Sequence, residues 1–142
     1  MALAIYELAD PNTSFSVSGV FTNPIPLTFD GTLGGVKEKK YYVRNNSVSH
    51  TYAGIVLQPI DSSGAHLIDG TVGFSWKLSE GNTQPTEVEW ATIDDGNSIT
   101  LSAINDSNTY LPFWLRVAVP RATSVQSFDS VTLKITVTET LI

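Results

Sequence analysis

Two histidines, His50 and His66, are the residues best suited to acid–base chemistry, because imidazole titrates near neutral pH. Both stand beside turn-forming residues. Neither belongs to a recognised catalytic spacing, since the sequence contains no G-x-S-x-G pattern of a serine hydrolase and no H-E-x-x-H pattern of a zinc protease. We therefore expect both histidines to be surface residues, and we predict that the protein is not an enzyme.

The carboxylates give no stronger indication of a site. Five aspartates stand near turns, namely Asp61, Asp69, Asp94, Asp95 and Asp106. A glycoside hydrolase would need two of them to face each other across a cleft, and no loop here resembles the twelve-residue calcium loop. Hydrogen bonds to nearby backbone already explain aspartates in turns. The sequence also has no cysteine, which excludes thiolate metal sites and disulfides, so we expect no catalytic, metal or cofactor site.

Three tryptophans could bind a ligand if their rings lay exposed in a row, because large rings stack on sugar faces. They are Trp76, Trp90 and Trp114. Trp76 stands in phase with Phe74 and Leu78, which favours a place in the core. A carbohydrate-binding module therefore remains an alternative that depends on where the rings lie.

Trp114 is the best candidate for contact with another molecule. It alternates with Phe113 and Leu115, so it should lie on the opposite face of its strand from these two residues. A large ring on that face meets either water or another chain, and aromatic residues are enriched at protein interfaces. We expect Trp114 to lie at an interface, with a sugar as the less favoured ligand.

The strand that carries Trp114 is one of two strongly alternating segments near the end of the chain. Residues 110–120 and 131–139 both place apolar residues at every second position, as expected for strands with one buried face. Ten mostly polar residues, 121–130, join them. We predict that these two segments form an antiparallel hairpin that closes a β-sandwich.

Further alternating segments and turn signals bring the expected total to about seven to nine strands. This number favours an all-β fold, an immunoglobulin-like or jelly-roll-like antiparallel β-sandwich. A helix is plausible only within residues 80–95, where Thr86 and Glu89 match a capping box. We expect at most one short helix there.

We predict that the chain divides into an N-terminal strand with a proline-rich arm, residues 1–26, and a β-sandwich domain, residues 27–142. The arm carries apolar residues between its turn and proline signals: Phe15, Val17, Phe21 and Ile25. An extended arm can add a strand to the sheet edge of a neighbouring subunit. We therefore expect these four residues to be interface residues.

The charge balance excludes several partners. With 8 basic and 14 acidic residues, the formal net charge is −6, and the only basic cluster is Lys37, Lys39 and Lys40. A nucleic-acid-binding protein needs a basic stripe, so we expect no nucleic acid as a partner. No apolar run approaches the roughly 20 residues that span a membrane, and the first residues do not resemble a signal peptide. We expect a protein made in the cytosol, with no membrane partner.

Four segments resemble structural proteins of tailed-bacteriophage virions. They are P-L-T-F-D-G at residues 26–31, Y-Y-V-R-N-N at 41–46, D-G-T-V-G-F-S-W-K-L at 69–78, and Y-L-P-F-W-L-R-V-A-V-P at 110–120. The likeness extends over residues 24–139 and consists of the residue patterns of the expected strands and the positions of the turns between them. Such proteins are similar to immunoglobulin-like sandwiches that coat, cement or adapt parts of the virion.

The resemblance implies a non-enzymatic structural protein of the virion, made in the host cytoplasm. A capsid decoration (cement) protein that binds the major capsid protein is the first expectation, and a homo-oligomer is implied, with a trimer favoured. A tail, baseplate or head–tail connector component is the alternative within the same class. A carbohydrate-binding module used in host attachment is the alternative from another class, and a hydrolase is the third. The resemblance supplies no catalytic residues.

Overall fold

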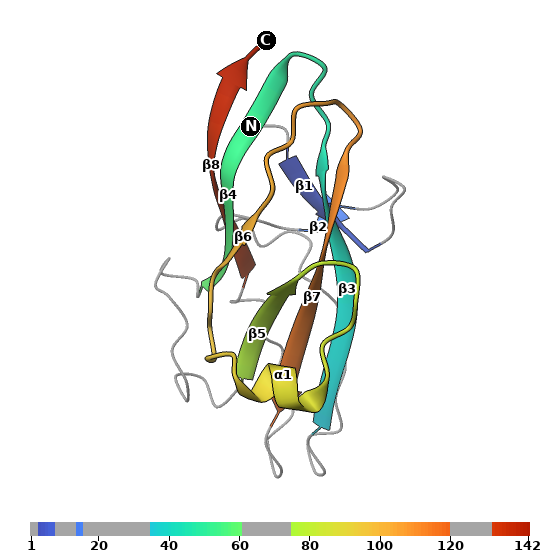
Figure 1. Cartoon of the computed structure of the whole chain (residues 1–142), viewed down its shortest axis with the longest axis vertical. Helices are drawn as coiled ribbons and strands as arrows, with labels where there is room; N and C mark the ends of the chain where they lie inside the picture. Colours follow the sequence, from blue (N-terminus) through green and yellow to red (C-terminus); the bar gives the residue numbers. More distant parts are fainter. Residues whose placement is uncertain (1–2, 8–13, 16–34, 61–74, 120–131) are drawn as a thin grey trace.

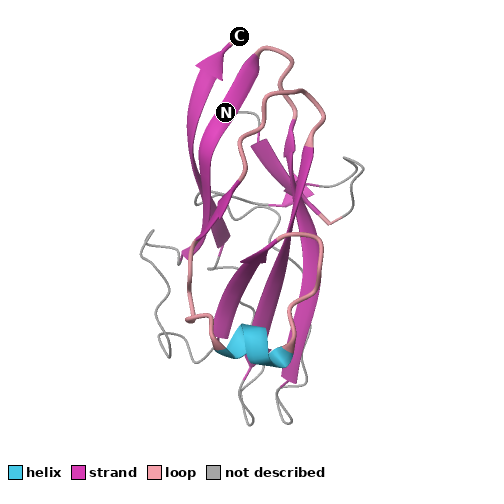
Figure 2. Cartoon of the chain, in the orientation of Figure 1, coloured by secondary structure: helices cyan, strands magenta, loops and turns pink. Residues whose placement is uncertain are grey.

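The computed structural model describes residues 3–7, 14–15, 35–60, 75–119 and 132–142, and in these residues the fold is almost entirely antiparallel β-structure. Two sheets pack against each other as the two layers of a sandwich, with one short helix at one end (Figures 1 and 2). The predicted all-β sandwich is therefore confirmed.

The larger sheet has five strands and the smaller has three. In spatial order the five are β2 (Ser14–Phe15), β1 (Leu3–Tyr6), β3 (Gly35–Asn45), β7 (Tyr110–Val119) and β5 (Ser75–Glu80). The three are β6 (Ile99–Leu101), β4 (His50–Ile60) and β8 (Thr132–Leu141). The connections β3–β4 and β6–β7 each carry the chain from one sheet to the other, and both lie at the same end of the molecule (Figure 1).

The core lies between the sheets and is built by the period of two along each strand. Tyr41 and Val43 of β3 and Phe113 and Leu115 of β7 are fully buried, whereas the residues between them are only half-buried. Ile55, Leu57 and Leu133 fill the layer from the smaller sheet. Trp76 belongs to this core and is 8% exposed, as its phase with Leu78 predicts. The alternation of apolar and polar residues thus predicts which face of each strand is buried in the core.

The predicted hairpin between the last two long strands is wrong. β7 pairs with β3 and β5, whereas β8 pairs with β4 in the opposite sheet. A strand has one buried face whether its neighbour in the chain lies beside it or across the core. The alternation within residues 110–120 and 131–139 therefore could not distinguish a hairpin from a connection between the layers.

Helix α1 (Glu87–Ala91) begins where the sequence predicts it. The Thr86 hydroxyl accepts a hydrogen bond from the Glu89 amide at 3.2 Å, and the Glu89 carboxylate accepts one from the Thr86 amide at 3.1 Å. This reciprocal pair satisfies two backbone donors that a helix leaves free at its start. The predicted capping box is thus confirmed.

Helix α1 covers one end of the outer face of the larger sheet (Figure 1). Lys77, on the outward side of β5, donates to the Trp90 carbonyl at 3.1 Å, and Arg116 of β7 forms an ion pair with Glu87 at 3.3 Å. The Trp90 ring is fully buried, and its indole nitrogen donates to the Glu38 carboxylate of β3. Trp90 therefore packs outside the main core and fixes the helix to the sheet.

The outermost long strand of the larger sheet, β5, has its free edge covered by a side chain. The Asn97 amide accepts from the Leu78 backbone N–H at 2.7 Å and donates to the Leu78 carbonyl at 2.8 Å. Gly96, at a φ of 71° that favours glycine, adds a backbone bond to the Trp76 carbonyl at 2.6 Å. Together they continue the ladder and leave less of the edge open to another strand.

The predicted arm lies largely outside the described residues. Within residues 1–26, β1 pairs with β3, and β2 pairs with β1 and places Phe15 opposite Ile5. His66 lies outside the described residues, and so do Val17, Phe21 and Ile25. Their expected interface role stays a prediction.

We predict that Asn97→Leu destabilises the protein by about 1–3 kcal/mol, because the Leu78 amide and carbonyl lose their partners. Urea denaturation measures the change in the free energy of unfolding. The control is Asn105→Leu at an exposed loop position. Equal stabilities of the two variants would contradict a role of Asn97 at the β5 edge.

Candidate functional site

An aromatic and cationic surface lies on the outer face of the larger sheet, beyond the part that helix α1 covers. It is formed by the residues that alternate with the buried positions of β3 and β7. We call this set the aromatic face; each member is half-buried, and the set comprises Lys40, Tyr42, Arg44, Tyr110, Pro112 and Trp114. The antiparallel register brings them together in three cross-strand pairs, Lys40 with Trp114, Tyr42 with Pro112, and Arg44 with Tyr110.

The cations of the aromatic face are held against its rings. The guanidinium carbon of Arg44 lies 5.5 Å from the centre of the Tyr110 ring, and the Lys40 ammonium lies 5.4 Å from the centre of the Tyr42 ring. The two rings meet edge to face, with centroids 6.3 Å apart and an interplanar angle of 85°. Each contact is of the favourable cation–π or aromatic type. The face is therefore an ordered array.

Two asparagines fix the position of Arg44. Its two terminal nitrogens donate to the side-chain oxygens of Asn46 and Asn108, which lie on different connections. The amide of Asn46 in turn donates to the Tyr6 hydroxyl at 2.9 Å. A guanidinium held by two acceptors and a ring has little freedom left to lose when a ligand binds, which favours binding.

Trp114 lies on the outer face, as its phase predicts, between Lys40 of β3 and Ser79 of β5 in the register. Its indole nitrogen donates to the Asn82 carbonyl at 3.3 Å, so the polar end of the ring is occupied while part of the ring stays exposed. The three tryptophans do not form an exposed row, because Trp76 and Trp90 are buried. A sugar platform on this sheet would instead use Tyr42, Tyr110 and Trp114.

The sequence alone does not single out the tyrosines and cations of this face as site residues. The sequence groups Lys40 with Lys37 and Lys39 in one basic cluster, yet the alternation of β3 places Lys40 on the opposite face from the other two. Lys39 forms an ion pair with Glu7, while Lys40 points to the outer face and lies over a ring. The available signal was the alternation of Tyr42 and Arg44 with buried neighbours, but their partners on β7 depend on the register.

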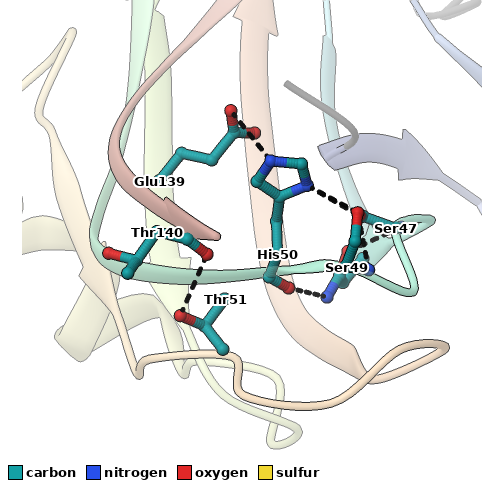
Figure 3. Close-up of polar contacts among 7 residues, drawn as sticks. Ser47, Ser49, His50, Thr51, Glu139 and Thr140 are labelled. Atoms are coloured by element: carbon teal, nitrogen blue, oxygen red, sulfur yellow. Dashed lines mark hydrogen bonds and ion pairs between the residues drawn. The ribbon is translucent and has the colours of Figure 1, made fainter. Parts of the chain in front are cut away.

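A second cluster surrounds His50, the first residue of β4 (Figure 3). The Nδ1 atom of its ring lies 3.0 Å from the Ser47 hydroxyl and 3.1 Å from the Ser49 hydroxyl, and Nε2 lies 4.0 Å from a carboxylate oxygen of Glu139 on β8. His50 is half-buried at the start of a strand and not in a loop. The order hydroxyl, imidazole, carboxylate is that of a hydrolytic triad.

The backbone around Ser47 argues against nucleophilic catalysis by this cluster. A triad needs free donors for the oxyanion that forms on the substrate. Here the Ser49 amide donates to the Ser47 hydroxyl at 3.1 Å, and the Ser47 amide donates to the Asn45 side chain at 2.8 Å. The amides of Ser47 and Ser49 are therefore both occupied. The geometry is that of a turn whose hydroxyls contact the imidazole, which in turn faces Glu139 of β8.

One buried asparagine positions both surfaces. Asn45 is fully buried, and its side-chain nitrogen donates to the carbonyls of His50 at 3.3 Å and Asp106 at 3.2 Å. Its backbone bonds to Thr109 at 3.2 Å and to Asn108 at 2.9 Å. Asn45 therefore joins the β3–β4 turn, which carries His50, to the β6–β7 connection, which leads into Tyr110.

The aspartates singled out in the sequence do not gather in the described part of the chain. Asp95 accepts from the Ser75 hydroxyl and lies 4.0 Å from the Lys77 ammonium, whereas Asp94 and Asp106 are exposed. Asp61 and Asp69 lie outside the described residues. Within the ranges that the structure describes, no three histidine or acidic side chains come together to hold a metal ion.

No protein-family model, curated protein or solved structure matches the chain. Its function is therefore inferred from the two surfaces above and from the resemblance of its sequence. In the described residues, no helix has the length and apolar character needed to cross a membrane.

We predict a dependence of stability on acid pH that involves Glu139. A hydrogen bond from Tyr52 lowers the pKa of Glu139 below its ordinary value of 4.5; desolvation opposes this shift, and the charge of His50 adds to it. The unfolded chain then binds the proton more readily. This contribution to stability is present above pH 4.5 and is lost as the pH falls through the folded pKa.

The measurement is urea denaturation at neutral pH and near pH 3 of the wild type, Glu139→Gln and Tyr52→Phe. The glutamine variant should lose less stability on acidification, because it has no carboxyl group to protonate. Tyr52→Phe should reduce the acid dependence as well, since it removes the donor that lowers the pKa. An unchanged acid dependence in both variants would refute the assignment.

We also predict that Asn45→Ala lowers the free energy of unfolding by about 3 kcal/mol or more, because the Ser47 amide and two carbonyls lose their partner in a buried place. Thermal and urea unfolding measure the loss. Asn105→Ala, at an exposed position, is the control and should leave the stability nearly unchanged. A small effect at Asn45 would mean that water can replace its amide.

Proposed function

We propose that the protein is a non-enzymatic structural protein of a bacteriophage virion, a decoration (cement) protein that attaches to the major capsid protein through the aromatic face. The resemblance of four sequence segments to virion proteins supports the class. The observation that carries the attachment is the ordered array of Tyr42, Tyr110, Trp114 and the two cations on one side of the larger sheet.

The composition of the aromatic face is that of a protein interface. Tyrosine, tryptophan and arginine are the residues in which binding energy concentrates, because they combine a large apolar area with a polar end. Here the rings and cations also hold one another in place, which reduces the entropy lost on binding. A single such face of six residues is small, so several copies acting together suit a decoration protein, and we propose a homo-oligomer, with a trimer favoured.

The His50 cluster favours this function over a hydrolase, because the amides of Ser47 and Ser49 are already bonded. A tail, baseplate or connector component would use the same face on a different partner. A carbohydrate-binding module is the second candidate, favoured by the adjacent rings of Tyr42 and Tyr110, which could stack on sugars. The decoration, adaptor and carbohydrate-binding alternatives predict different locations of the protein on the particle and different responses to soluble glycans.

We predict that antibody-gold labelling of intact parent particles places the protein over the head. Label confined to the tail or to a vertex would replace decoration by the adaptor alternative. An absence of label on every particle would contradict the virion function, and soluble glycans that quench tryptophan fluorescence would then favour the carbohydrate-binding module.

The same particles test the aromatic face after the native protein has been removed from them. Trp114→Ala and Tyr110→Ala should weaken rebinding by about tenfold or more, as expected of central interface residues. Lys134→Ala, exposed on β8 in the other sheet, is the matched control. If Lys134→Ala weakened rebinding as much as Trp114→Ala does, the contact with the particle would not be specific to the aromatic face.

A further inference from the structure

The cations of the aromatic face differ from others in the described chain in what they contact. Lys39, Lys77 and Arg116 each lie within 4.0 Å of a carboxylate of this chain. Lys40 and Arg44 contact aromatic rings and form no ion pair within the described residues. The six residues of the face include no acid, although the whole chain has 14 acidic residues against 8 basic ones. The face is a positive area on an acidic protein.

We propose that the aromatic face binds an extended acidic segment of a partner polypeptide, with one carboxylate at Lys40 and another at Arg44. This inference deepens the proposed function by giving the chemistry of the partner, and it rests on that function for the partner's identity.

The geometry of β3 defines the spacing of the two carboxylates. Lys40 and Arg44 stand four residues apart on one strand, with Tyr42 between them on the same face, so they lie roughly 13 Å apart along the strand. An extended segment has the same rise per residue. Two acidic side chains four residues apart would therefore meet both cations, and an apolar side chain between them would lie over Tyr42 and Pro112.

Arg44 keeps donors for a carboxylate while it is held by the protein. Each terminal nitrogen of a guanidinium carries two hydrogens, and the bonds to Asn46 and Asn108 use one on each. The contact with Tyr110 leaves the remaining hydrogens in place. Lys40 has no hydrogen-bond acceptor within the described residues and offers its ammonium in the same way.

The number of cations favours a polypeptide over a nucleic acid. Binding along a phosphate backbone requires a run of basic residues, and an overall charge of −6 opposes it. Two cations with rings between them match two carboxylates with an apolar side chain between them. Acidic polysaccharide and single-stranded DNA are therefore competing probes in the test.

The test is isothermal titration of the full-length protein with a synthetic extended peptide that carries two glutamates four residues apart around a leucine. The same peptide with both glutamates replaced by glutamine is the matched probe. We expect the glutamate peptide to bind at least about tenfold more tightly, and its affinity to fall with added salt. Equal affinity for the two peptides, or no binding of either, would overturn the proposal.

Protein variants identify the face. Lys40→Gln should weaken binding of the glutamate peptide several-fold, Arg44→Gln more strongly, and Arg44→Lys should restore part of the loss because it keeps the charge. Lys134→Gln on β8 should bind as the wild type does. Circular dichroism of each variant confirms that it is folded, and Lys40→Gln keeps the test valid if Arg44→Gln unfolds. Unchanged binding by Lys40→Gln would overturn the proposal, as would tighter binding of alginate or oligo-dT than of the glutamate peptide.

Particle labelling separates this inference from the proposed function. If the Lys40→Gln variant labels particles as strongly as the wild type, the acidic-segment proposal fails and the virion function stands. If the wild type labels no particle but binds the glutamate peptide through Lys40, the virion function fails and the chemistry of the face stands.

Discussion

The arrangement of this sandwich depends on the buried amide of Asn45. Leaving this buried amide without partners would cost more free energy than its hydrogen bonds contribute when they are made. Folding is therefore favourable only when the amide bonds to His50, Asp106 and Ser47. These bonds hold two connections that run between the sheets at one end of the molecule. The adjoining backbone bond to Thr109 then sets the register in which Arg44 lies opposite Tyr110. The buried amide of Asn45 thereby helps to position Arg44 and Tyr110 on the outer face of the larger sheet.

The outer face of the larger sheet divides into two parts with different chemistry. At one end, helix α1 buries Trp90 and uses acids to neutralise the cations of the sheet, as Glu87 does for Arg116. At the other end, rings take the place of acids beside Lys40 and Arg44. Trp114 stands between the two parts and bonds to the loop that leads into the helix. One part of the sheet is thus closed by the chain itself, and the other is the part that we propose a partner covers.

Local patterns predicted local structure well and pairing poorly. The alternation around Phe113 and Leu115 predicts a strand and its buried face, and Thr86 with Glu89 predicts the start of the helix. Both signals lie within a few residues. By contrast, the hydrogen-bond acceptor of the Trp90 indole is Glu38, 52 residues earlier in the chain. The imidazole of His50 lies close to the carboxylate of Glu139, which belongs to a strand near the other end of the chain. Such partners depend on which sheet each strand joins, and periodicity is the same for either choice.

The covered edge of β5 has a consequence for crowded assemblies. Strand edges with free backbone groups pair edge to edge when copies are concentrated, and the product is an open ribbon without a defined size. The Asn97 side chain occupies those groups at Leu78 in each molecule before any neighbour arrives. Copies held close together would therefore form few new hydrogen bonds by pairing their β5 edges. The sheets of neighbouring copies then stay separate at this edge, and the outer face is not used up by contact between copies.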